Sequence, residues 1–483
     1  MTARYITTTL PYVNADPHIG FALEIVQADA LARYWRLVGD DVFFSTGTDE
    51  HGQKVWQKAQ EKGEDIQKYV DHYAASFKTL SDTLGLSCDN FVRTTDDKHV
   101  VAAQELWRRC EAQGDIYKKK YTGLYCVGCE AFVTEDDLIE GECPQHPGQK
   151  PEILEEENYF FALSKYERGL SDYLSREDVI IPEHRRKEAQ LFVQNGLQDF
   201  SISREKTRMP WGIPVPGDDT QVMYVWFDAL TNYISTLGWP CSTERKQHTP
   251  DCRFRKFWAE GETLQEAGKD QVRFQSIIWQ AMLMSANLPT TDKVFYHGFI
   301  TSGGKKMSKS IGNVIGPNEL VQKYGTDATR YLLLRHVHPT DDTDITWERL
   351  DEWYEAHLVN GLGNLASRIM KMAETHLEKP IDHPEKGLFP DQYTTALKEL
   401  RFTDALDVVW ARVQALDERI TQEEPFKLVK TDLGKGKQVI SELVAELYIT
   451  ARLLNPCMPE TSKRIKDSVL SNKKPENIFP RLT

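Results

Sequence analysis

Short apolar runs and longer segments of helical periodicity alternate along the first hundred residues. Residues 4–10 and 41–46 are apolar, β-branched runs of the length of a buried strand. Between them, apolar residues recur at three- and four-residue spacing from Ile19 to Val38, after Asp16 as the expected N-cap and Pro17 as the first helical residue. A strand–helix–strand order of this kind predicts a parallel α/β sheet.

The alternation continues to about residue 115 and then breaks. Residues 65–84 and 97–113 have helical periodicity, and residues 90–93 predict a strand between them. Residues 116–153 are instead rich in turn-forming residues and hold a group of cysteines. We therefore expect an insertion here, between two halves of one sheet.

The second half of the chain returns to strands and then becomes helical. Predicted strands lie at residues 222–227, 272–274 and 294–300. A helix is predicted at residues 275–287. From about residue 320 onward the pattern is almost entirely helical, with breaks at 378–392 and 432–437.

Length and composition restrict the class of protein. The 483 residues suggest about three domains, and a 40% hydrophobic and 27% charged composition excludes intrinsic disorder. No apolar run reaches the roughly 18 residues of a membrane helix, and the first ten residues lack the apolar core of a signal peptide. We therefore expect a cytoplasmic protein that does not enter a membrane, in which eight cysteines are too few for a disulfide scaffold.

The net charge of −14 argues against a surface coated for nucleic-acid binding. The charge is uneven, however, because the segment from Ala356 onward is nearly neutral. That balance permits a local site for a polyanion on the helical tail.

The first candidate motif is Pro-His-Ile-Gly-Phe at residues 17–21, at a helix start after a strand and a loop. A helix N-terminus offers unpaired N–H groups and the positive end of the helix dipole, both suited to phosphate. His18 can donate to phosphate oxygens, and Gly20 lets a nucleotide approach the backbone closely. Taken alone, His18 is more often a surface histidine near a helix cap.

The second motif is Gly-Gly-Lys-Lys-Met-Ser-Lys-Ser at residues 303–310. Lys306 and Lys309 place two cations three residues apart on a glycine-rich loop, next to Ser308. A phosphate group that shifts its charge during reaction needs such countercharge. A lysine-rich loop by itself is usually a solvated surface.

The third motif is Cys126-x2-Cys129-x13-Cys143-x2-His146. Three thiolates and one imidazole at these spacings suit tetrahedral zinc, and four protein ligands close the site, so the metal would be structural. The alternative is four residues that merely cluster. We expect one zinc per chain.

Together these residues resemble the methionyl-tRNA synthetase family of class I aminoacyl-tRNA synthetases. The two signature motifs are His-Ile-Gly-Phe at 18–21 and Lys-Met-Ser-Lys-Ser at 306–310. Further similar segments, in order along nearly the whole chain, lie at residues 10–14, 47–52, 125–130, 201–204, 224–229, 268–270, 297–298 and 363–368.

The resemblance implies a methionine–tRNA ligase. Such an enzyme activates methionine with ATP and Mg²⁺ to methionyl-adenylate and pyrophosphate, and then transfers methionine to the 3′-terminal adenosine of its tRNA. The implied catalytic residues are His18, Gly20, Lys306 and Lys309. The implied ATP-binding set adds Phe21, His297 and Ser308.

The resemblance also implies a methionine pocket, in which an unbranched thioether would lie among aromatic and aliphatic side chains. Its residues would be Leu10, Tyr12, Asp49, Trp226, Ala229, Tyr233, Asp270, Gln271 and Gln275. Each aromatic residue alone is more often core. Gln271 and Gln275 stand where the family usually has isoleucine and histidine, and Phe21 stands in place of the second histidine of the first motif. Glutamine can hydrogen-bond but cannot titrate.

The helical tail carries the last matching positions. Asn364 and Arg368 lie four residues apart, on one helix face, and Phe426 follows Pro425 where relatives carry a tryptophan that stacks on an anticodon base. The resemblance therefore implies anticodon binding by Asn364, Arg368 and Phe426. The partners would be methionine-specific tRNA, including the initiator, together with ATP and L-methionine, and the absence of an appended domain after residue 483 predicts a monomer.

The expected fold is α/β, with a Rossmann-like parallel-sheet catalytic domain split by a zinc-knuckle insertion and followed by an all-α anticodon-binding bundle. The expected divisions are a first catalytic half at 1–115, the insertion at 116–221, a second catalytic half at 222–320, a stem-contact linker at 321–355 and the helical domain at 356–483.

Two alternatives remain open at this point. Another class I synthetase of the same sub-group is disfavoured because the insertion is too short for an editing domain, and because no ligands for a catalytic-site zinc are seen. A non-catalytic RNA-binding relative is disfavoured because the signature residues His18, Gly20, Lys306 and Lys309 are all present.

Overall fold

The computed structural model describes residues 1–126, 131–133, 135–144, 148, 150–241, 252–307, 314–381 and 389–482. It separates into two compact units. The sheet unit comprises Met1–Pro17, Gly39–Thr79 and Cys88–His297. The helical unit comprises His18–Val38, Leu80–Ser87 and Gly298–Thr483.

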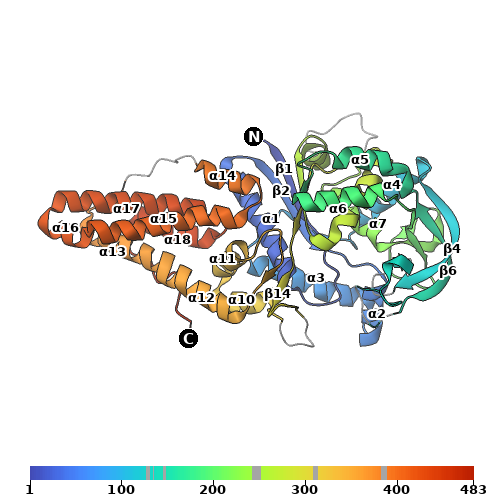
Figure 1. Ribbon diagram of the computed structural model, residues 1–483, viewed down its shortest axis with the longest axis horizontal. Coiled ribbons are helices and arrows are strands. Elements are labelled where there is room, and N and C mark those ends of the chain that lie inside the picture. Colours follow the sequence, from blue (N-terminus) through green and yellow to red (C-terminus); the bar gives the residue numbers. More distant parts are fainter. Residues whose placement is uncertain are drawn as a thin grey trace. The chain divides into compact units, whose positions relative to one another are not determined.

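The sheet unit is built on a parallel sheet, of which β1 and β2 are labelled in Figure 1. Within the described residues it has six strands, in the order β3-β2-β1-β12-β13-β7, and every neighbouring pair is parallel. The strands are β1 (Ala3–Thr8), β2 (Asp41–Thr48), β3 (Asn90–Arg93), β7 (Ile180–Ile181), β12 (Glu262–Gly268) and β13 (Lys293–His297). The predicted parallel α/β sheet is thus confirmed.

Strand β12 lies in the centre of this sheet although its sequence is largely polar. Its Thr263 and Gln265 are buried because Thr263 hydrogen-bonds to Asp292 and Gln265 accepts from the Thr291 hydroxyl at 2.8 Å. The strand predicted at residues 272–274 is therefore wrong, since those residues follow β12 and enter a helical segment.

Helices in the sheet unit supply most of its core. Trp107, Trp279 and Tyr296 are fully buried there, on α4, α9 and β13. The α-helices are α2 (Gln53–Lys62), α3 (Ile66–Thr83, whose end belongs to the helical unit), α4 (Asp97–Ala112), α5 (Glu167–Leu174), α6 (Glu183–Gln194), α7 (Val225–Leu230), α8 (Asn232–Ser235) and α9 (Trp279–Ser285). Shorter helical segments are η1 (Glu135–Asp137), η2 (Leu163–Tyr166), η3 (Phe254–Ala259), η4 (Lys269–Gln271) and η5 (Phe274–Ile278).

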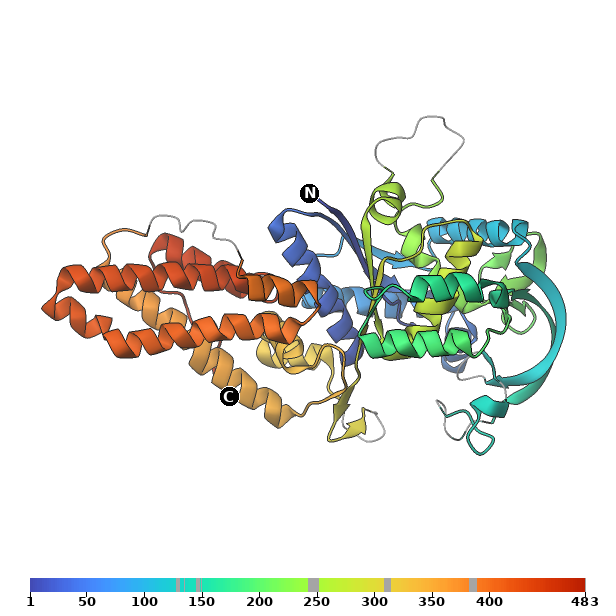
Figure 2. The ribbon, with the colours of Figure 1, turned by 45° about the horizontal axis from the view of Figure 1, so that its top comes forward.

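The insertion contains two antiparallel sheets. The prediction of a turn-rich segment at residues 116–153 is wrong for its first part, because β4 (Ile116–Cys126) pairs along its length with β6 (Glu152–Phe161), and the two curve together in Figure 2. Strand β4 also pairs with β5 (Ala131–Val133), and β6 also pairs with β8 (Phe200–Ser201). A second antiparallel sheet contains β9 (Ser203–Glu205), β10 (Pro214–Val215) and β11 (Asp218–Met223).

The strand predicted at residues 222–227 is correspondingly wrong at its end. The chain leaves β11 at Met223 and begins helix α7 at Val225. A short apolar run fits a buried strand or a buried helix equally well, so periodicity alone could not separate the two.

The helical unit confirms the predicted helical tail. Its helices are α1 (Ile19–Val38), α10 (Pro317–Tyr324), α11 (Thr326–His336), α12 (Trp347–Trp353), η6 (Tyr354–Gly363), α13 (Asn364–His376), α14 (Asp391–Lys398), α15 (Phe402–Glu423), α16 (Pro425–Thr431), α17 (Leu433–Leu454) and α18 (Pro459–Ser471). Helices α15, α17 and α18 lie side by side in both views (Figure 1, Figure 2). The break predicted at 432–437 is confirmed but is shorter than predicted, because α16 ends at Thr431, Asp432 caps α17 through the Lys435 N–H, and α17 runs from Leu433 onward.

Two boundaries in the helical unit differ from the sequence pattern. Helix α1 begins at Ile19 instead of Pro17. The strand predicted at 294–300 ends at His297, and β14 (Ile300–Ser302) pairs instead with β15 (Lys305–Lys306) and β16 (Thr343–Asp344). The separation occurs at Gly298, where an added Cβ would lie 2.3 Å from the Asp341 carbonyl. None of the helices described is long and apolar enough to cross a membrane.

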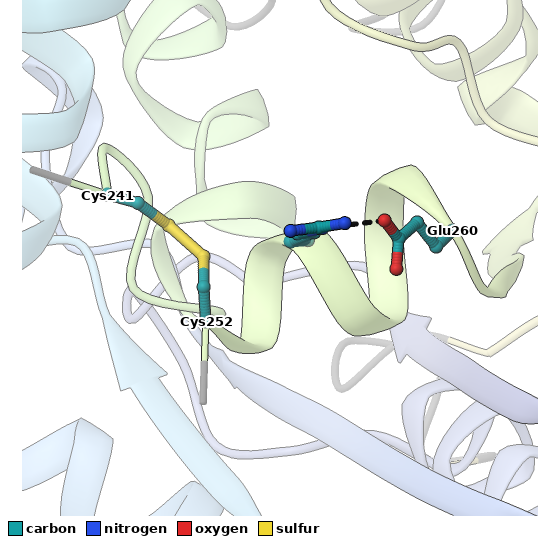
Figure 3. The surroundings of a disulfide bond; sticks show 4 residues. Cys241, Cys252 and Glu260 are labelled. Atoms are coloured by element: carbon teal, nitrogen blue, oxygen red, sulfur yellow. Dashed lines mark hydrogen bonds and ion pairs between the residues drawn. A yellow bond between two sulfur atoms is a disulfide. The ribbon is translucent and has the colours of Figure 1, made fainter. Parts of the chain in front are cut away.

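A disulfide joins Cys241 and Cys252, whose Cα atoms are 6.8 Å apart (Figure 3). It connects the segment after α8 to the start of η3, where Arg255 forms an ion pair with Glu260 at 2.6 Å. The sequence analysis did not foresee this bond.

Candidate functional site

Polar and aromatic side chains gather where the parallel strands of the sheet unit end. Tyr12 follows β1, Asp49 follows β2, Asp270 follows β12, and His297 is the last residue of β13. Because carboxyl ends of neighbouring parallel strands share one edge, the topology brings these residues to the same side of the sheet. Open α/β sheets bind their ligands at that edge.

The backbone fixes the first pair directly. Tyr12 and Asp49 form a parallel bridge, in which the Asp49 N–H donates to the Pro11 carbonyl at 3.0 Å and the Val13 N–H donates to the Asp49 carbonyl at 3.2 Å. Asp49 is buried, and the bridge holds its backbone beside that of Tyr12.

The Tyr12 ring belongs to a cluster of three aromatic rings. Trp226, on α7, stacks on Phe274 with ring centroids 3.7 Å apart and planes at 15°. Tyr12 meets Trp226 edge-on at 6.3 Å. We call Tyr12, Trp226 and Phe274 the aromatic cluster. The sequence analysis named Tyr12 and Trp226 and missed Phe274, although Phe274 stands directly before the predicted Gln275.

Ala229 and Tyr233 follow Trp226 along the chain, and both are buried. The buried Gln275 donates from Nε2 to the Tyr233 hydroxyl. The structure thus joins two predicted pocket residues by a hydrogen bond. Leu10, half-buried, follows the end of β1.

Gln271 behaves differently from Gln275. It donates to the Asp270 carboxylate at 3.0 Å, on the turn that follows β12. A Cβ at Gly268 would lie 2.7 Å from Asp270 Oδ1 and 3.8 Å from the His297 ring, so this turn is closely packed around the glycine. The two glutamines therefore form separate contacts, one to a carboxylate and one to a phenol.

The first signature motif lies in the helical unit, at the start of α1. The exposed His18 accepts the Phe21 N–H on its Nδ1 at 3.2 Å, so the imidazole caps the helix. The Phe21 side chain is buried, and a Cβ at Gly20 would lie 3.1 Å from the His18 ring. Glycine at position 20 therefore leaves room for the histidine to keep this orientation.

The lysine loop follows β14 in the same unit. Gly303 and Gly304 both have left-handed φ, at 63° and 70°, and make the turn into β15. Lys306 lies in β15, and only its backbone is described. Ser308 and Lys309 lie outside the described residues.

Of the four predicted metal ligands, two lie within the described residues. Cys126, at the end of β4, and Cys143 are both buried. Cys129 and His146 lie outside the described residues. Among the residues that the structure describes, no group of three or more potential metal ligands is found.

The predicted anticodon residues lie in the helical unit. Asn364 and Arg368 are both on α13, the first exposed and the second paired with the Asp417 carboxylate. Phe426, on α16, is 44% exposed, with the Lys427 ammonium 5.9 Å from its ring.

Comparison with known proteins gives one consistent result. The family model described as tRNA synthetases class I (M) matches residues 4–150 and 145–370. A methionine–tRNA ligase of Thermotoga maritima is 40% identical over 98% of this chain and 76% of its own length. A methionine–tRNA ligase of Brucella suis is 39% identical over 96% of this chain and 91% of its own.

Solved structures agree in fold. Mycobacterium tuberculosis methionyl-tRNA synthetase in complex with methionyl-adenylate has a TM-score of 0.87 at 34% identity, covering 100% of this chain and 99% of that one. The free form of the same enzyme has a TM-score of 0.82 at 31% identity.

Proposed function

Because the chain belongs to the methionyl-tRNA synthetase family and acts as a methionine–tRNA ligase, we propose that it binds methionine at the aromatic cluster beside Asp49. The enzyme activates methionine with ATP to methionyl-adenylate and pyrophosphate, and then transfers methionine to the 3′-terminal adenosine of tRNA. The observation that supports this site is the stack of Trp226 on Phe274, joined through the ring of Tyr12 to the backbone bridge that holds the buried Asp49.

The methionine side chain would lie among apolar and aromatic groups. A thioether is polarizable and packs well against ring edges, which the edge-on pair of Tyr12 and Trp226 provides. We assign the ammonium group to Asp49. The remaining proposed contacts are Leu10, Ala229, Tyr233, Asp270, Gln271 and Gln275.

ATP would be bound by the two signature motifs. His18, held by its cap on α1, would donate to phosphate, and Gly20 would admit the nucleotide close to the backbone. Phe21 is buried and would act through the N–H that holds His18. His297 at the end of β13 and Ser308 of the loop complete the proposed ATP set.

Lys306 and Lys309 would stabilise the negative charge that moves onto the leaving pyrophosphate. Charge of this kind is greatest in the transition state, so their contribution belongs to kcat more than to substrate binding. Mg²⁺ would accompany ATP, because phosphate oxygens are its preferred ligands. No covalent intermediate with the protein is needed, since positioning and charge stabilisation are sufficient for phosphoryl chemistry.

We also retain the structural zinc as a proposal. Cys126 and Cys143 fit such a site because both thiols are buried, the first at the end of β4 and the second next to the Ile139–Glu142 bridge. With Cys129 and His146 they would form a closed tetrahedral set, which would crosslink the loops of the insertion.

For tRNA we propose anticodon contacts by Asn364, Arg368 and Phe426. The exposed Phe426 ring can stack on a base. The Lys427 ammonium near it is paired with the Glu424 carboxylate at 2.6 Å. Methionine-specific tRNA, including the initiator, and a cytoplasmic location are further proposals. The stem-contact role of residues 321–355 and the domain boundaries at 115, 221, 320 and 355 are proposals as well.

ATP–pyrophosphate exchange tests this assignment. Lys309→Ala should lower kcat by about 100-fold to 1000-fold with little change in methionine KM, as for loss of one group that stabilises developing charge. The matched control is Lys305→Ala, which removes a lysine of the same loop outside the signature. Trp226→Ala should instead raise methionine KM. An intact kcat in Lys309→Ala, or an unchanged methionine KM in Trp226→Ala, would contradict the corresponding role.

A further inference from the structure

A buried carboxylate in the sheet unit joins three segments that are far apart in sequence. Asp228, on α7, is fully buried. Its Oδ2 accepts from His51 Nδ1 at 2.7 Å, and its Oδ1 accepts from His99 Nε2 at 2.7 Å. His51 lies between β2 and α2, and His99 lies on α4. One side chain therefore connects a strand-end loop and two helices.

The donors and acceptors of this group form a continuous chain. His99 Nε2 donates to Asp228, and the other ring nitrogen of His99, Nδ1, is hydrogen-bonded to the Ser235 hydroxyl, 2.9 Å away on α8. His51 and His99 are 6% and 1% exposed, so the chain is shielded from water along its length.

Asp228 is ionised in this environment. Burial alone would raise the pKa of its carboxyl, but the charge and hydrogen bonds of His51 and His99 lower that pKa below the ordinary value. A buried carboxylate is stable only when its acceptor positions are used, so Asp228 strongly favours one placement of the two imidazoles.

The hydrogen bond between His51 and Asp228 joins the two halves of the proposed methionine site. His51 lies two residues from Asp49, the proposed partner of the ammonium group. Asp228 lies between Trp226 and Ala229, on the helix that supplies the side-chain slot. The bond from His51 to Asp228 is thus a direct crosslink between the carboxylate half and the aromatic half.

We propose that Asp228 is a positioning residue for methionine, holding the Asp49 segment and the Trp226 helix in register through His51. The proposal rests on the methionine site proposed above. Asp228 touches neither substrate, so its effect is on the spacing of the groups that do. Misplacement by about 1 Å is enough to cost a large factor in binding and rate.

The test breaks the link at His51 in the full-length enzyme. His51→Leu removes the N–H that reaches Asp228, and it should raise methionine KM about ten-fold while ATP KM changes less than two-fold. His51→Asn is the conservative variant, because its amide N–H falls near the position of Nδ1, and it should restore most of the methionine affinity. Equal KM values in the two variants would overturn the proposal.

A second variant separates positioning from folding. His51→Leu leaves Asp228 with one partner fewer, so a fall in thermal stability could accompany it. Combining His51→Leu with Asp228→Asn removes the buried charge while the link stays broken. The combined variant should recover melting temperature but keep the raised methionine KM. Recovery of both together would mean that the group only stabilises the fold, and would overturn the proposal.

Trp226→Ala distinguishes the two levels of inference. If Trp226→Ala raises methionine KM and His51→Leu does not, the methionine site stands and the positioning role of Asp228 is wrong. If Trp226→Ala leaves methionine KM unchanged, the proposed site itself is wrong, and the positioning role is wrong with it.

Discussion

Replacing Phe274 by leucine tests the aromatic cluster at a residue that sequence reasoning did not identify. Phe274 lies on η5, and its ring centroid is 3.7 Å from that of Trp226 with planes at 15°. Leucine keeps an apolar side chain of similar size but has no ring to stack. Trp226 would keep its edge-on contact with Tyr12 and lose the surface that fixes its plane.

The magnitude follows from the contact that is lost. An aromatic pair contributes about 0.5–1.5 kcal/mol beyond simple burial. If that free energy orients Trp226 for methionine, its loss corresponds to a rise in methionine KM of about two-fold to ten-fold. ATP KM should not change, because the cluster is proposed to contact methionine and not ATP.

The assay is ATP–pyrophosphate exchange, first with methionine varied at saturating ATP and then with ATP varied at saturating methionine. The matched control is Phe43→Leu, on β2, where the ring contacts Tyr5 and Phe257 instead of Trp226. Phe43→Leu should change stability but not methionine KM. If Phe274→Leu leaves methionine KM unchanged, or raises ATP KM equally, the reasoning from the stack is refuted.

Three further predictions concern stability and metal content. Replacing Cys241 and Cys252 by serine should lower the free energy of unfolding of the sheet unit by up to about 3 kcal/mol, which is the loop-closure value for their separation of 11 residues. In denaturant titrations, added reductant should destabilise the native chain but not the serine variant. Burial lowers the pKa of His336 to about 3, against about 6.5 in the unfolded chain, so between these values the unfolded state binds a proton that the folded state does not. The free energy of unfolding of the helical unit should therefore fall by about 1 kcal/mol from pH 7 to pH 5.5. The same pH dependence in a His336→Gln variant would contradict this. Elemental analysis should find about one zinc per native chain and little in Cys143→Ser, and equal metal in both would remove Cys143 from the ligand set.

Local sequence patterns predicted those helices and strands in which the spacing of apolar residues matches the face that is buried. Residues 90–93 and the helices near 66–83 and 97–112 are examples, because their apolar faces point to a core on one side. Strand β12 could not be found in this way. Its Thr263 and Gln265 are buried in the centre of the sheet and are paired with groups near residues 291 and 292, so their environment is set by distant chain.

The candidate site shows the same division. Motif resemblance named Tyr12, Asp49 and Trp226 together, and in the structure Tyr12 contacts both, through its bridge to Asp49 and its edge-on contact with Trp226. It could not reveal that Asp228 joins His51 and His99, because these residues are more than a hundred positions apart from Asp228 in sequence. A buried aspartate with two histidine partners carries no local signal. Likewise, Cys241 and Cys252 are an ordinary pair of cysteines until the fold brings them together.

The most direct test of the account is ATP–pyrophosphate exchange measured across the twenty amino acids, with the native chain and with Trp226→Ala. Gln271 and Gln275 stand where isoleucine and histidine are usual in the family, yet the proposed slot at the aromatic cluster would favour an apolar side chain by about 0.8 kcal/mol per buried methylene. The account predicts that methionine has the highest kcat/KM in the native chain and that Trp226→Ala loses this preference through methionine KM. A higher kcat/KM for any other amino acid, or a methionine preference that survives Trp226→Ala unchanged, would contradict it.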